Sequence, residues 1–108
     1  MSKLKKSSYG QLIQELETMC EFLNVDLKYE KIQSHHPRKS ALFKIKGTWK
    51  LIIDRHTTVE EKYLLLLDNL ALFDRETIFI QPALRDTLDR RQTELESLGK
   101  KLPGRENG

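Results

Sequence analysis

The chain of 108 residues contains little of several residue types, and each shortage excludes a class of protein. A single cysteine, Cys20, excludes an internal disulfide and a cysteine-based zinc cluster, and favours a reducing, cytoplasmic location. Three prolines and five glycines are too few for a low-complexity or linker-like chain. No apolar run approaches the ~20 residues that cross a bilayer. The basic start of the chain is followed by polar residues, so we expect neither a secretory signal nor a membrane partner.

Charge is distributed unevenly along the chain, which has a formal net charge of +3. The first six residues carry +3 and the last nine carry +2, so the residues between them sum to −2. Because the excess positive charge lies at the two ends, it says little about a partner. We expect a flexible basic arm at residues 1–7, a single α+β domain at 8–99 and a flexible basic tail at 100–108.

Apolar periodicity predicts the element order α-β-β-β-α-(β)-α. Apolar residues repeat at helical spacing in the first segment, alternate with polar residues through three strands, and then return to helical spacing. The expected fold class is α+β, with a small, mostly antiparallel three-stranded sheet packed by three helices. The elements are expected at 9–24, 25–30, 41–46, 49–54, 59–73, 78–80 and 82–98.

The second and third helices carry more specific signals. Thr58 and Glu61 have the spacing of a capping box, which predicts that the second helix begins near Val59. That helix is apolar on nearly every side, so we expect it to be buried in the centre of the fold. The third helix has a narrow apolar seam that fits either the domain core or a second copy of the chain, which leaves a homodimer open. The seam consists of Leu84, Leu88, Leu95 and Leu98.

The basic stretch around the expected hairpin is the best candidate for a binding surface, because residues 31–50 contain no acidic residue. Alternation places Phe43, Ile45 and Trp49 toward the core, which predicts that the lysines project from the solvent face. Such a stripe would suit the phosphates of a nucleic acid or a protein partner. The alternative is that the lysines protect a sheet edge from aggregation. The candidate residues are Arg38, Lys39, Lys44, Lys46 and Lys50.

One segment, over about residues 40–75, resembles the zinc-metallopeptidase-like domains of the ImmA/IrrE group. The resemblance rests on the pattern Leu51-Ile-Ile-Asp54, then Thr58-Val-Glu-Glu61, then Leu66-Leu-Asp-Asn-Leu-Ala-Leu72. It implies that Asp68 and Leu72 stand at the positions of the two zinc-binding histidines and Asn69 at that of the catalytic glutamate. Leucine cannot bind zinc and asparagine cannot act as a base, so the peptidase activity is not carried over.

The remaining candidates lie at strand ends and in loops. Asp54 and His56 follow a strand, and together with Asp68 and Asn69 they are candidates to line a cleft; the alternative is that they cap their elements. No metal site is expected, because the neighbouring His35 and His36 point apart on an extended segment. Cys20 belongs to the apolar stripe of the first helix, where a core role is favoured over a nucleophilic one.

These observations leave three hypotheses for function. The first is a non-enzymatic binding or interaction domain, bacterial in style and cytoplasmic, whose protein partner or second copy is not identified by the sequence. The second is a nucleic-acid-associated protein that uses residues 38–50. The third is an enzyme on a degenerate metallopeptidase-like scaffold. No set of catalytic side chains can be assembled from the sequence, so we expect neither catalytic residues nor a cofactor.

Overall fold

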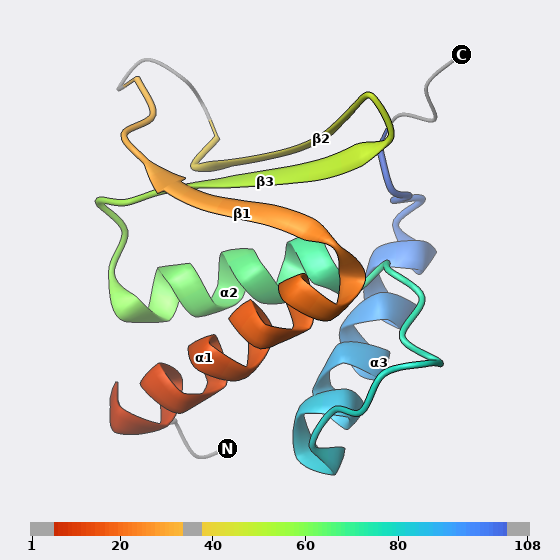
Figure 1. The fold of residues 1–108 in the computed structure, drawn as a ribbon. Helices are drawn as coiled ribbons and strands as arrows, with labels where there is room; N and C mark the ends of the chain where they lie inside the picture. Colours follow the sequence, from red (N-terminus) through yellow and green to blue (C-terminus); the bar gives the residue numbers. More distant parts are fainter. Residues whose placement is uncertain (1–5, 34–37, 104–108) are drawn as a thin grey trace.

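The computed structural model describes residues 6–33 and 38–103, apart from the side chains of Lys6 and Ser7. Most of the expected arm and tail, and the loop histidines His35 and His36, therefore lie outside the described residues. Three helices and one three-stranded sheet form the domain, which confirms the expected α+β class (Figure 1). The elements are α1 (Lys6–Leu23), β1 (Val25–Glu30), β2 (Ser40–Ile45), β3 (Thr48–Asp54), α2 (Val59–Leu70) and α3 (Pro82–Ser97).

The sheet is mixed, with the strand order β1-β3-β2. β2 and β3 form the expected antiparallel hairpin, whereas β1 runs parallel to β3 on its other side. All three helices lie on one side of the sheet, and no helix of the described residues covers the other face, called the open face here (Figure 1). The core forms between this inner face and the helices, and its fully buried side chains include those of Leu16, Leu51, Ile53, Leu66 and Leu88.

The hairpin turn fixes which side chains face the core. Lys46 and Gly47 connect the strands with φ values of 49° and 82°, and a type I′ turn requires positive φ at both positions. The register pairs Lys44 with Trp49, so these two side chains share the inner face. It pairs Phe43 with Lys50 on the open face. The prediction that Phe43 and Ile45 face the core was therefore wrong, whereas the inward direction of Trp49 is confirmed, on the same face as the buried Leu51 and Ile53.

α2 begins at Val59 behind the predicted capping box. The Thr58 hydroxyl accepts from the Glu61 backbone N–H, and the Glu61 carboxylate accepts from the Thr58 N–H, both at 3.1 Å. The face toward the core buries Tyr63, Leu66, Leu67 and Leu70. Leu64 points away from the core and is 46% exposed, so the helix is not buried on every side as expected.

α3 follows an irregular segment, residues 71–81, that links it to α2 (teal in Figure 1). The extended piece expected at 78–80 pairs with no strand in the described part of the chain. Three leucines of the predicted seam, Leu84, Leu88 and Leu95, are buried in the core of the domain itself, while Leu98 is 68% exposed. Leu102 also packs against the core, which carries the folded part beyond residue 99. None of the described helices has the length and apolar character that a membrane crossing needs.

Candidate functional site

The five basic candidates around the hairpin do not form one surface. Lys39 pairs with Glu61 of α2 at 3.3 Å, and Lys50 pairs with Asp26 of β1 at 2.7 Å on the open face of the sheet. The hydrogen bond from Lys50 is the main reason why the pKa of Asp26 lies below its usual value. Both lysines are thus engaged with carboxylates inside the domain.

The other three basic candidates lie in different surroundings. Lys44 projects on the inner side, where its ammonium group lies 5.2 Å from the centre of the Trp49 ring. Lys46 occupies the hairpin turn, and Arg38 lines a small cavity beside α2. The predicted stripe of lysines on the solvent face is therefore wrong, because Lys44 and Lys50 point to opposite faces of the sheet.

Asp68 and Asn69, which the sequence placed at a possible cleft, line this cavity of about 280 Å³. The Asp68 carboxylate accepts two hydrogen bonds from Arg91 of α3, at 2.7 and 3.0 Å. The Asn69 amide donates to the carbonyl of Leu65 at 2.8 Å and to the hydroxyl of Ser40 at 3.1 Å. Both side chains hold neighbouring elements together, and the metallopeptidase-like resemblance stays a prediction.

Asp54 and His56 lie apart from this cavity, at the end of β3. The Asp54 carboxylate accepts a hydrogen bond from the His56 backbone N–H at 3.0 Å. The backbone carbonyl of Asp54 accepts one from the Thr57 hydroxyl, also at 3.0 Å. These bonds confirm the expected cap of the strand-to-helix connection. Across residues 6–33 and 38–103, no three His, Cys, Asp or Glu side chains come together as a metal site would need.

Cys20 is buried in the core, as the apolar stripe of α1 predicts. Burial, followed by the charges of Glu17 and Glu21, raises the pKa of its thiol from 9.0 to about 12. The nucleophilic form of cysteine is the thiolate, which is scarce at neutral pH when the pKa is this high. The residue therefore serves the packing of α1.

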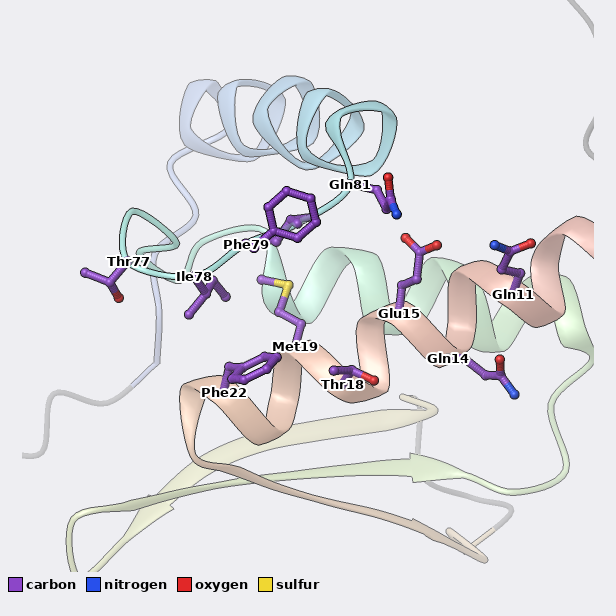
Figure 2. Close-up of a pocket in the computed structure, with 11 residues that line it drawn as sticks. Gln11, Gln14, Glu15, Thr18, Met19, Phe22, Thr77, Ile78, Phe79 and Gln81 are labelled. Atoms are coloured by element: carbon purple, nitrogen blue, oxygen red, sulfur yellow. The ribbon is translucent and has the colours of Figure 1, made fainter.

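A larger concave surface lies elsewhere, between α1 and the segment that precedes α3 (Figure 2). It has a volume of about 610 Å³ and is called the α1 groove here. One wall is a single face of α1, because its residues recur at intervals of three and four. The other wall is the segment before α3. The lining residues are Gln11, Gln14, Glu15, Thr18, Met19, Phe22 and residues 77–81.

The Glu15 carboxylate is the unusual group of the groove. Its Oε1 atom is buried and has no hydrogen-bond partner among the described residues. The side chain extends from α1 toward Gln81, and Gln11 lies beside it (Figure 2). Buried polar atoms in folded proteins nearly always have a partner, so each exception calls for an explanation.

Two phenylalanines expose their rings at the groove. Phe22 is 61% exposed on α1, and Phe79 is 78% exposed on the opposite wall. Figure 2 shows Met19 pointing from α1 toward Phe79, so apolar side chains from both walls approach each other. Exposed aromatic rings around a concave surface are typical of binding sites.

Two arginines fix the wall opposite α1. Arg75 is 5% exposed and donates to the carbonyls of Ala71 and Phe73, at 2.8 and 3.0 Å. It also bonds to Asp89 of α3 at 2.6 Å and to Gln92 at 2.8 Å. Arg85 of α3 donates to the carbonyl of Ile78 at 2.8 Å. The groove is thus formed by a segment that is tied to α3 by hydrogen bonds rather than by a free loop.

Sequence reasoning missed this groove, because Glu15 lies off the apolar stripe of α1, on a side that helical spacing assigns to solvent. One signal was nevertheless present. Phe22 lies off the apolar stripe of α1 and seven residues after Glu15, so both belong to one further face of the helix. The apolar run at residues 78–80 gave no such signal, because the sequence explained it as an extended element and only the structure shows it to be irregular.

Comparison of the chain with protein-family models, with curated proteins and with solved structures gives no match.

Proposed function

We propose that the chain is a non-enzymatic binding domain and that the α1 groove is its ligand site. The observation that carries the proposal is the unpaired Oε1 atom of Glu15, which lies in a groove bordered by the exposed rings of Phe22 and Phe79. Ligand sites are concave, mostly apolar and roughly 300–1,000 Å³ in volume, with a few polar groups that orient the ligand. The groove, at about 610 Å³, has this size and this composition.

The side chains that chemistry would need have structural partners instead. Cys20 is buried with a raised pKa, Asp68 is bound by Arg91, and Asn69 donates to two acceptors of the domain. A nucleophile or base that acts on a substrate must be within hydrogen-bond reach of it. These positions favour binding over catalysis as the role of the domain.

The nucleic-acid hypothesis has less support from the arrangement of charges. Phosphate binding gains affinity from several cations that act together on one backbone. Lys39 and Lys50 already have carboxylate partners, and Lys44 lies on the opposite face of the sheet from Lys50. We therefore place the binding surface at the α1 groove rather than at the hairpin.

The test uses a small neutral aromatic probe, tryptophol, whose indole ring fits an apolar groove and whose hydroxyl carries no charge. Backbone amide NMR shifts during a titration should change mainly at residues 11–22 and 77–81. Phe79→Ser should weaken the affinity about fivefold, because an aromatic contact contributes roughly 1 kcal/mol.

The matched control is Ile45→Ser, which removes another exposed apolar side chain, 47% accessible, from the hairpin. This variant should bind tryptophol as the wild type does, because Ile45 does not line the α1 groove. Shifts that are scattered over the sheet, or equal weakening by the two variants, would contradict the proposed site.

A further inference from the structure

The charge inside the α1 groove comes from a single residue. Among the lining residues that the structure describes, Glu15 is the only one with an ionisable side chain, and the other polar groups are the neutral side chains of glutamine and threonine. No lysine or arginine is among the described residues that line the groove, so none of them neutralises the carboxylate. A ligand that enters it therefore meets one negative charge in an otherwise neutral, largely apolar surface.

The state of this carboxylate favours a cationic donor. Oε1 of Glu15 is shielded from solvent and has no donor among the described residues, so part of the charge is poorly compensated. The terminal torsion of a glutamate is broad and roughly two-fold, so the carboxylate can rotate to present either oxygen to the groove. A cation that donates a hydrogen bond to this group gains more there than a neutral donor would.

The aromatic rings of the groove also favour a positively charged ligand. The faces of aromatic rings attract organic cations, and this attraction grows when the cation is partly desolvated. Phe22 lies on the same face of α1 as Glu15, and Phe79 lies on the opposite wall above Met19 (Figure 2). A ligand that spans the groove can therefore place its charge at the carboxylate and its apolar body against Met19 and the rings.

From this geometry we infer that the ligand of the α1 groove is a small organic cation, an amine or amidine carried on an aromatic or apolar body. The inference rests on the proposed function, because it names the class of molecule that the same site takes. A small molecule fits better than a protein segment, since the volume of about 610 Å³ is that of a small-molecule site. Glu15 is then the residue that selects the charge of the ligand.

The experiment compares three probes with one indole body and different charge: tryptamine, tryptophol and indole-3-acetate. The wild-type domain should bind tryptamine about tenfold more tightly than tryptophol, because a hydrogen bond to a charged group exceeds a neutral one by roughly this factor. Indole-3-acetate should bind more weakly than tryptophol. Glu15→Gln keeps the shape of the side chain and should bring tryptamine to within about twofold of tryptophol.

Glu21→Gln is the control, because it removes the same charge from an exposed position of the same helix that does not line the groove. This variant should keep the preference for tryptamine. Equal affinities of tryptamine and tryptophol in the wild type would overturn the inference and leave the proposed function intact, whereas no binding of either probe would overturn both. Binding of an acetylated Trp-Lys dipeptide amide about tenfold more tightly than tryptamine would instead assign the groove to a protein partner.

Discussion

At the scale of single residues, Arg75 and Glu15 contrast a buried polar group that has partners with one that has none among the described residues. Arg75 is buried and bonds to four acceptors, two of them backbone carbonyls. Oε1 of Glu15 is buried and has no partner among the described residues. A satisfied buried charge holds a fold together, while an unsatisfied one costs stability and calls for an explanation, for which we propose a bound ligand.

Cys20 provides a prediction about stability at alkaline pH. Burial raises the pKa of its thiol from 9.0 to about 12, so folding favours the protonated form. The thiol's contribution to the free energy of unfolding is therefore fully present below about pH 9 and is lost as the pH rises toward 12. By about pH 10.5, titration of Cys20 should lower the free energy of unfolding by on the order of 2 kcal/mol. Urea unfolding of the wild type at several pH values between 8 and 11 measures it.

The variant Cys20→Ala isolates this contribution. It should be less stable than the wild type near neutral pH, because a core side chain is shortened, but its stability should fall less steeply with pH. Some alkaline loss should remain in the variant, because burial, followed by the hydrogen bond to Glu17, also raises the pKa of Tyr29. Parallel pH profiles of the two proteins would show that the thiol does not titrate in this range.

Single residues also show where sequence reasoning reached its limit. The core position of Cys20 followed from the spacing of its apolar neighbours, since burial of one helix face is a local property. The position of Glu15 did not, because its surroundings are formed by residues 77–81, more than sixty positions away in the chain. Tertiary contacts of this range have no periodic signal in the sequence.

At the scale of elements, α2 shows how a helix with apolar residues on several sides divides them between core and solvent. The sheet lies over one side of it, and α1 and α3 contact it as well. Leu66 and Leu70 have no exposed surface, whereas Leu64, two residues from Leu66, is 46% exposed. The helix therefore offers two leucines of identical chemistry in opposite environments.

We predict that Leu66→Ala lowers the free energy of unfolding by about 2–5 kcal/mol, because the substitution leaves a cavity in the core. Leu64→Ala, the matched control on the same helix, should change it by no more than about 0.5 kcal/mol, as exposed substitutions usually do. The denaturant midpoints of both variants, measured with the same m-value, test this difference. Equal losses in the two variants would mean that α2 is rotated relative to the described structure.

The helices and strands themselves were largely predictable, but the apolar side chains of β2 were assigned to the wrong face of the sheet. The capping box set the start of α2, and Asn24, with a φ of 61°, follows the end of α1 in the left-handed region that asparagine tolerates. In β2, however, alternation alone was misleading, because Ala41, Phe43 and Ile45 are apolar side chains on the open face. A two-residue turn pairs even-numbered with odd-numbered residues, so the turn could have placed Lys44 beside Trp49.

At the scale of the whole molecule, the described part of the chain forms a sheet whose helices all lie on one face (Figure 1). The order of the elements follows from the sequence, but the parallel pairing of β1 with β3 does not, since either direction satisfies the same alternation of side chains. The placement of α3 depends on the irregular segment before it, which carries few local signals. The groove exists because this segment is held between α1 and α3.

The last prediction concerns the arginine that holds this segment. Replacement of Arg75 by methionine keeps an unbranched apolar stem but leaves the carbonyls of Ala71 and Phe73 without their donor. The side chain of Asp89 is 56% exposed and can be hydrated in the variant. The free energy of unfolding should therefore fall by about 2–4 kcal/mol, mainly because the two buried carbonyls lose their donor. Hydrogen exchange at residues 77–81 should accelerate more than in the strands, because the segment that contains them is no longer bonded through Arg75 to Asp89 and Gln92 of α3.

Arg90→Met is the control, since Arg90 is exposed on α3 and its pair with Asp86 is long, at 3.9 Å. Such a pair contributes little, and the variant should stay within about 0.5 kcal/mol of the wild type. Because the segment forms one wall of the α1 groove, Arg75→Met should also weaken tryptophol binding under conditions where the variant is folded, whereas Arg90→Met should not. A smaller loss in the free energy of unfolding of Arg75→Met, together with unchanged exchange protection at residues 77–81, would contradict this prediction. It would mean that the burial of Phe73 and Ile80 is sufficient to hold the wall of the groove in place.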